Sequence, residues 1–347
     1  VQRPGENKFR EITLVREKIE IDPITYSALL DDNVGYFHYS GFTNGSSSRV
    51  KETILDLKKK GAKSLVIDLR GNGGGILDEA VNVVNFFVQK GLEIVSTRGK
   101  VKQWDRSYRT QNQPLDTLMP IVVLIDTGSA SASEIVAGSL QDLDRAVIIG
   151  NRSFGKGLVQ TPRDLPYGGN IKITTSKYYI PSGRCIQALD YSHRNPDGSV
   201  ARVPDSLTHV FKTKNGREVR DGGGITPDYL IPQEKGGTIG YYLLTENIIF
   251  DYVTGWVIKH PTVASPASFR LSDTDYEQFK QFVKTKDFQY DQMSNRSLQS
   301  LKNIMEFEGY FNTASEEFKA LEEKLQPDLD RDLDLFRKEI IKMIETE

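Results

Sequence analysis

Two hydrophobic patterns divide this chain of 347 residues. Through the first two thirds, short apolar runs alternate with amphipathic stretches, a pattern typical of strands that alternate with helices. Strands are predicted at 34–40, 64–69, 121–125, 146–149 and 170–180, and helices at 48–60 and 77–90. Because alternating elements pack as crossovers on a mainly parallel sheet, this region predicts an α/β fold.

In the last hundred residues, apolar positions recur at helical spacing. Four amphipathic helices are predicted there, with apolar stripes that include Phe279, Leu301, Leu321 and Ile340, and Pro327 separates the last two. The stripes predict a packed helical region. A contact with a second copy of the chain, forming a homodimer, is an alternative use for the same stripes.

The first twenty residues stand apart from both patterns. Residues 3–6 (RPGE) predict a turn, and 9–16 alternates like a strand. Such a piece is too small to fold alone, so it needs a partner. From the residues themselves, the partner is either the main sheet or another domain.

Serines gather where the predicted strand at 121–125 meets the following helix. Ser129, Ser131 and Ser133 alternate with alanines, and Glu134 comes next. This is a suitable place for a hydroxyl nucleophile, because helix N-terminal amides point toward any developing anion. The alternative is structural: Ser131 and Glu134 match a capping box. The residues themselves leave open which serine would act.

A lysine flanked by glycines, Lys156, follows the next predicted strand. The surrounding loop resembles a phosphate-binding loop, but Gly157 stands where Ser or Thr would hold magnesium. Prolines and glycines within 158–169 also exclude the helix that would receive phosphates.

Lysine has an ordinary pKa of about 10.4, which makes it a poor base at neutral pH. Apolar walls such as Phe154 and Leu158 would lower the pKa of Lys156. A neutral amine could then accept the proton of a serine hydroxyl.

A glycine run at 71–75 follows the predicted strand at 64–69. It permits a tight turn, or lets backbone N–H groups approach a substrate carbonyl closely. It does not match a dinucleotide fingerprint, because Ile76 stands where the third glycine would be.

The run SASASEIVAGSLQD at 129–142, followed by FGKGLVQ at 154–160, resembles the C-terminal processing (tail-specific) serine proteases, which use a serine–lysine dyad. The resemblance implies that Ser131 is the nucleophile and that Lys156, twenty-five positions later, is the general base.

Further site residues follow from the same resemblance. It implies that Gln160 orients the lysine and that Asp142 supports activity. For the oxyanion hole, it implies one donor from the glycine-rich loop, Gly74 or Gly75, and a second from Ala132.

The resemblance also implies an architecture. It predicts a crotonase/ClpP-like catalytic core at 21–235, a PDZ-domain remnant at 1–20 and a helical C-terminal region at 236–347. Two later stretches, PSGR at 181–184 and GITPD at 224–228, also match the family. Between them, 191–220 reads as a polar, loop-rich insertion.

Composition narrows the function classes. Lys plus Arg is 45 against 47 for Asp plus Glu, so the net charge favours neither nucleic acid nor membrane surfaces. The basic stretch at 96–116 is interpreted as an exposed connection. With the single Cys185 and four scattered histidines, no metal site and no cofactor are expected.

These features together predict a serine endopeptidase that acts near protein C-termini by acyl-enzyme chemistry. Its expected partners are proteins or peptides with accessible C-termini. The alternative is a catalytically silent protein-binding scaffold of the same fold. The resemblance implies a periplasmic or cell-envelope location, and a chain starting at Val1 without methionine is compatible with an exported, processed protein.

Overall fold

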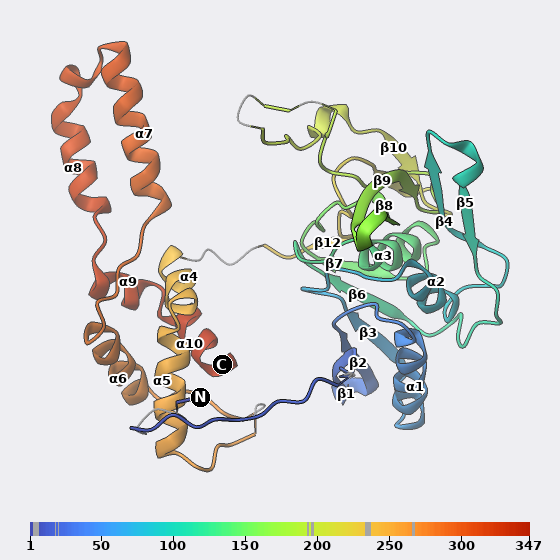
Figure 1. Cartoon of the computed structure of the whole chain (residues 1–347), viewed down its shortest axis with the longest axis horizontal. Helices are drawn as coiled ribbons and strands as arrows, with labels where there is room; N and C mark the ends of the chain where they lie inside the picture. The colour runs from blue at the N-terminus through green and yellow to red at the C-terminus, as the bar shows by residue number, and fades with distance from the viewer. Residues whose placement is uncertain are drawn as a thin grey trace. The chain divides into compact units, whose positions relative to one another are not determined.

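The computed structural model describes residues 1–2, 7–17, 19, 21–192, 194–195, 198–232, 237–265 and 268–347. The chain forms two compact units, Val1–Gln233 and Glu234–Glu347. The first unit contains both sheets and helices, and the second is helical (Figure 1). The predicted α/β class and the helical C-terminal region are therefore confirmed.

The main sheet of the first unit has six strands in the order β1-β2-β3-β6-β7-β12. The β1 strand pairs antiparallel with β2, and the remaining neighbours are parallel. The predicted strands at 34–40, 64–69, 121–125 and 146–149 correspond to β2, β3, β6 and β7. The bounds are Ile24–Leu30 for β1, Val34–Tyr39 for β2, Ser64–Asp68 for β3, Ile121–Ile125 for β6, Val147–Gly150 for β7 and Tyr229–Leu230 for β12.

Three helices accompany this sheet: α1 (Ser46–Lys59), α2 (Leu77–Asn85) and α3 (Ala132–Asp142). Their apolar faces and the sheet form one buried core. The α2 helix is shorter than the predicted 77–90. At its end, the Asn85 side chain accepts hydrogen bonds from the N–H groups of Gln111 and Asn112. The last turn of α2 therefore bonds to a loop.

A second, four-stranded antiparallel sheet has the order β5-β4-β9-β8. The interpretation of 96–116 as an exposed connection is wrong, because part of it pairs as a hairpin. Arg109 bonds Glu93 across that hairpin, and Arg98 lies over the Tyr179 ring. The bounds are Glu93–Gly99 for β4, Arg106–Arg109 for β5, Leu158–Asp164 for β8 and Asn170–Tyr179 for β9.

The β9 strand confirms the strand predicted at 170–180, whereas β8 was not predicted. Its sequence carries Pro162, which cannot donate to a ladder. Because β8 lies at the sheet edge and pairs only with β9, it is a strand position where proline is tolerated. The predicted insertion is mostly loop but includes a hairpin of β10 (Val210–Lys212) and β11 (Glu218–Arg220).

The strand predicted at 9–16 is wrong, because those residues form no strand with any described part of the chain. Two backbone bonds join Val1 and Arg10, and the predicted turn at 3–6 lies outside the described residues. A strand needs a neighbour to satisfy its backbone, and the described sheet offers none here. Assignment of 1–20 to a PDZ remnant stays a prediction.

The helical unit contains all four predicted helices, but the last one is broken in two at Phe336. The ring of Phe336 packs over Gly237, where a Cβ would lie 2.4 Å from the ring. Two earlier helices, α4 (Thr238–Thr245) and α5 (Ile248–Lys259), were missed, because their apolar residues make no single stripe. The other bounds are Asp273–Lys284 for α6, Met293–Glu308 for α7, Ser315–Leu325 for α8, Leu329–Leu335 for α9 and Arg337–Thr346 for α10.

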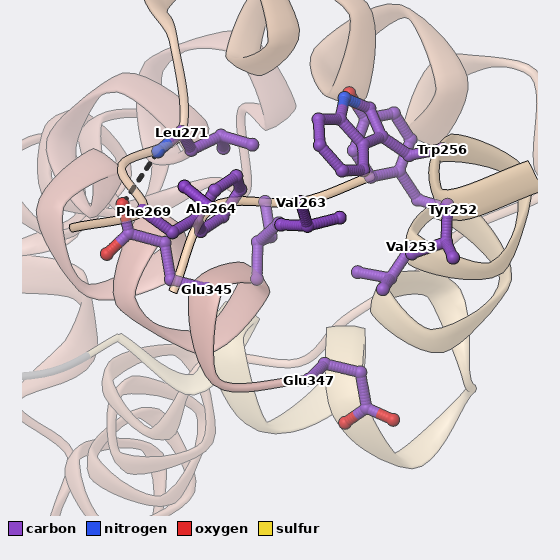
Figure 2. Close-up of a pocket in the computed structure, with 11 residues that line it drawn as sticks. Tyr252, Val253, Trp256, Val263, Ala264, Phe269, Leu271, Glu345 and Glu347 are labelled. Atoms are coloured by element: carbon purple, nitrogen blue, oxygen red, sulfur yellow. Dashed lines mark hydrogen bonds between the residues drawn. The ribbon is translucent and has the colours of Figure 1, made fainter. Parts of the chain in front are cut away.

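The core of this unit packs aromatic and aliphatic residues, among them the fully buried Tyr276, Phe279 and Leu333. The unit contains a pocket of about 210 Å³. Figure 2 shows residues that line it, among them Trp256 of α5, Glu345 of α10 and residues between α5 and α6. Within the described ranges, no helix combines the length and the apolar character needed to cross a membrane.

Candidate active site

A cavity of about 280 Å³ in the first unit brings together the start of α3, the lysine loop and the second sheet. Five of the seven predicted site residues line it: Gly75, Ser131, Ala132, Lys156 and Gln160. The cavity also has apolar walls from Leu77, Ile135 and Leu158.

Ser131 occupies a strained position between β6 and α3. It is the N-cap of α3, with φ 56° and ψ −111°, a conformation that non-glycine residues rarely adopt. Before it, Asp126 closes the turn by accepting the N–H of Gly128 and Ser129. Strain of this kind costs on the order of 1–3 kcal/mol and is common at functional sites.

The structure distinguishes the three serines. Ser129 and Ser133 are fully buried, and their hydroxyls donate to the carbonyl oxygens of Leu69 and Asn72, at 2.7 and 2.8 Å. These bonds hold the turn against the glycine-rich loop. Ser131 is the one of the three that lines the cavity. Of the three serines that the residues themselves left open, the geometry therefore favours Ser131.

Glu134 is the site residue that sequence reasoning gave only a capping role. Its Oε2 accepts the N–H of Ser131 at 2.8 Å, the predicted capping bond, and also the N–H of Lys156 at 2.9 Å. Its Oε1 accepts the N–H of Gly155 at 2.7 Å and the hydroxyl of Ser153 at 2.5 Å. One carboxylate therefore joins the backbone of Ser131 to the loop that carries Lys156.

The carboxylate of Glu134 is fully buried. Burial raises its pKa, and the Ser153 hydroxyl and the three N–H donors act in the opposite direction. All the donors named above point at the carboxylate, and the positive end of the α3 dipole lies beside it. The sequence carried one signal for this position, because the capping-box acid Glu134 is followed directly by the apolar Ile135 and Val136.

Lys156 lies in the loop between β7 and β8. Its side chain lines the cavity with Leu158, but Phe154 is 43% exposed and is not part of the lining. The predicted apolar enclosure therefore comes from Leu158 and not from Phe154. In the described part of the chain, no carboxylate forms an ion pair with the Lys156 ammonium.

The glycine-rich loop presents Gly75 to the cavity and not Gly74. The Gly74 N–H donates to Asn72 Oδ1 at 2.9 Å, so it is already engaged. A Cβ on Gly74 would lie 2.6 Å from the Ala130 carbonyl oxygen, so the loop packs tightly against the serine turn. Gly75 and Ala132 both line the cavity, and neither N–H has a partner among the described residues. Of the two glycines predicted as oxyanion donors, the geometry favours Gly75.

The remaining two predicted residues differ in their positions. Gln160 of β8 lines the cavity. Asp142 does not line the cavity, because it is the last residue of α3. That helix has eleven residues, so its two ends are about 15 Å apart. It pairs there with the buried Arg184 at 2.8 Å and accepts the N–H of Ser182 at 3.0 Å. A direct role for Asp142 beside Lys156 is not supported by this geometry.

The described residues contain no group of three or more His, Cys, Asp or Glu side chains that could hold a metal ion. Of the four histidines noted in the sequence, His193 lies outside the described residues.

Two family models match the chain. Residues 33–197 match peptidase family S41, and residues 239–347 match the C-terminal helical domain of a probable PDZ-protease. The two matches fall on separate units of the structure.

Curated relatives include a carboxy-terminal-processing protease of Bartonella bacilliformis, 42% identical over 193 residues. That match covers 54% of this chain and 44% of the relative. A probable CtpA-like serine protease of Staphylococcus aureus is 38% identical over 189 residues, covering 54% of this chain and 37% of the relative. The chain thus spans less than half the length of these relatives.

Among solved structures, the photosystem II D1 C-terminal processing protease is 28% identical, with a TM-score of 0.45. That match covers 62% of this chain and 50% of the solved one. The S41 model matches the unit that carries the cavity, and these relatives are proteases, so this part of the chain is similar to the S41 C-terminal processing serine proteases.

Proposed function

We propose that this chain is an endopeptidase that cleaves proteins near their C-termini, with Ser131 as nucleophile and Lys156 as general base. The observation that carries the proposal is the shared cavity. Ser131, Lys156, Gly75 and Ala132 all line it, and the N–H groups of Gly75 and Ala132 have no partner among the described residues. These are the parts that acyl transfer requires.

In the proposed reaction, Ser131 Oγ attacks the scissile carbonyl while its proton passes to Lys156 Nζ. The carbonyl oxygen becomes an oxyanion, which accepts hydrogen bonds from the N–H groups of Gly75 and Ala132. The tetrahedral intermediate expels the amine product, which takes the proton from Lys156. Water then attacks the acyl carbonyl while Lys156 takes its proton, and Lys156 returns that proton to Ser131 Oγ as the acyl bond breaks and the acid leaves. Loss of one oxyanion donor typically slows such steps about 10²- to 10³-fold.

The second sheet supports an extended peptide as the substrate. The β8 strand lies at its edge and carries Leu158 and Gln160 of the cavity wall. A sheet edge beside a nucleophile lets a peptide add as a further strand, with main-chain bonds for affinity and side-chain pockets for selectivity.

Substitutions at the dyad test the proposal. Ser131→Ala and Lys156→Ala should lower peptide cleavage by at least about 10³-fold, and Lys156→Arg should fail as well, since a guanidinium stays protonated. Lys172→Met is the matched control, because Lys172 also lines the cavity but has no proposed part in proton transfer. The measurements are peptide cleavage by mass spectrometry and labelling by a serine-directed fluorophosphonate.

Ser131→Ala protein that cleaves at the wild-type rate would exclude the assignment. A folded wild-type chain that neither cleaves peptides nor takes the label would favour the alternative, a catalytically silent binding scaffold. In that case, the same peptides should still bind to the chain without turnover.

The location and partners are part of the proposal. We place the protein in the bacterial periplasm or cell envelope, as the family resemblance implies, which cell fractionation would test.

The helical unit is a candidate homodimer contact, because Leu301 and Ile304 of α7 are about half exposed. Sedimentation of wild type and a Leu301→Glu/Ile304→Glu variant would test that contact.

A further inference from the structure

We propose that Tyr178 is a positioning residue, whose hydroxyl holds the general base and the nucleophile at a constant separation. The inference rests on the proposed function of Ser131 and Lys156. The Tyr178 hydroxyl donates to the carbonyl oxygen of Lys156 and lies 3.3 Å from the carbonyl oxygen of Ser131. One phenolic oxygen thus contacts the main chain of both residues.

The backbone of Tyr178 also contacts the lysine loop. Its N–H donates to the Gly157 carbonyl oxygen at 3.0 Å. Tyr178 belongs to β9, which lies inside the second sheet with β4 on one side and β8 on the other. The hydroxyl is therefore carried by a strand that is paired on both edges, so it has little freedom to follow a moving loop.

Glu134 approaches the same two residues from the opposite side. It accepts the N–H of Ser131 and the N–H of Lys156, while Tyr178 contacts both of their carbonyl oxygens. Each catalytic residue therefore has its N–H bonded to one buried side chain and its carbonyl oxygen in contact with another. This double attachment limits rotation of the backbone that aims Oγ and Nζ.

The state of the hydroxyl suits this role. Tyr178 is 2% exposed, and burial raises the pKa of its hydroxyl well above the ordinary value. It therefore stays protonated and remains a donor at neutral pH. The Ser131 carbonyl oxygen has a second partner, the Ile135 N–H at 3.0 Å, so the Lys156 carbonyl oxygen depends more on Tyr178.

Tyr178→Phe removes one oxygen atom and keeps the ring that fills the core. The Lys156 carbonyl oxygen would lose its side-chain donor, and the loop would be free to shift. Misplacement of a catalytic group by about 1 Å can cost about 10²-fold in rate. The matched control is Tyr179→Phe, which removes the same atom from the next residue, where Arg98 lies 4.7 Å from the ring centroid.

The test compares kcat, KM and the rate of fluorophosphonate labelling in the two variants. Tyr178→Phe should lower kcat roughly 10- to 100-fold and slow labelling in step, with KM and thermal midpoint close to wild type. Tyr179→Phe should keep all four values within about twofold. Tyr178→4-aminophenylalanine keeps a donor at the same place and should recover most of the lost kcat. A Tyr178→Phe protein with wild-type kcat, or no recovery with the amino variant, would overturn the inference.

Amide hydrogen exchange gives a measurement that does not depend on turnover. The Lys156 amide should exchange at least about tenfold faster in Tyr178→Phe than in wild type or Tyr179→Phe, because the loop has lost an attachment. Should the wild-type chain lack activity, the proposed function fails, and exchange still decides the role of Tyr178. Equal exchange in all three proteins would contradict it.

Discussion

The two ends of α3 each bury a carboxylate, and each satisfies it in a different way. At the N-terminal end, Glu134 accepts three N–H groups and one hydroxyl, all uncharged. At the C-terminal end, Asp142 pairs with the guanidinium of Arg184, and the two side chains are 0% and 1% exposed. Burial raises the pKa of both carboxylates, and Arg184 opposes that rise at Asp142.

The difference is informative because the donors show what each carboxylate holds together. Those of Glu134 belong to Ser131 and to the loop that carries Lys156, so it organises the cavity. The pair of Asp142 and Arg184 lies away from the cavity and fastens the turn after β9, where the Ser182 N–H also binds Asp142. The first arrangement therefore concerns reactivity, and the second concerns the stability of the fold.

The largest expected effect is on stability, at the C-terminal end. Arg184→Met leaves the buried Asp142 without its cation, and breaking a buried pair costs about 3–5 kcal/mol. Urea unfolding should report this loss in the free energy of unfolding. The double variant Asp142→Leu/Arg184→Met should regain most of it, because no uncompensated charge remains. If the free energy of unfolding of Arg184→Met lies within about 1 kcal/mol of the wild-type value, the pair contributes little to stability.

The second prediction concerns the N-terminal end. Glu134→Gln keeps the side-chain shape but replaces one acceptor oxygen by an NH₂ group, which would face N–H donors. We expect kcat to fall about 10²-fold, equivalent to about 2.7 kcal/mol, as the serine and lysine segments separate. Asp142→Asn is the comparison, and its kcat should fall less than that of Glu134→Gln when both are measured on folded protein. A larger loss of kcat in Asp142→Asn than in Glu134→Gln would contradict the distinction between the two ends of α3.

The smallest expected effect concerns a partly exposed pair, which sharpens the contrast with both buried carboxylates. Lys58 lies 2.6 Å from Asp116, and its hydrogen bond lowers the pKa of Asp116 to about 2. Because the folded-state pKa is below the unfolded value of about 3.9, the pair stabilises the protein above that value. That contribution is lost as pH falls from about 4 to about 2.

Lys58→Met should therefore lower the free energy of unfolding by about 1 kcal/mol at pH 7. The difference from wild type should disappear near pH 2, as measured by urea unfolding across pH. Lys60→Met is the control. The Lys60 ammonium lies 2.7 Å from the Asp56 carboxylate, but both side chains are more than half exposed, so this pair should contribute less than about 0.5 kcal/mol. A Lys58→Met difference that persists at pH 2 would argue against this origin.

The amino-acid sequence predicted five strands of the first unit and the candidate residues of the site, whereas β1, β4, β5, β8 and β12 were not predicted. Short runs of strand-forming residues, and alternation in the case of β9, located β2, β3, β6, β7 and β9 within about a residue. The residues themselves suggested a serine paired with Lys156, and the family resemblance implied that the serine is Ser131. In the helical unit, α4 and α5 were missed because their apolar residues surround the axis and produce no stripe.

Only the tertiary structure decided between alternatives that share the same local pattern. Ser129, Ser131 and Ser133 have similar neighbours in sequence, but Ser129 and Ser133 bond to the carbonyl oxygens of Leu69 and Asn72, about sixty residues earlier. Gly74 and Gly75 are adjacent, yet the Asn72 side chain engages one and leaves the other facing the cavity. Glu134, Lys156 and Tyr178 meet through bonds that cross between separate elements. Such bonds depend on how strands and helices pack, and a local sequence pattern does not contain that information.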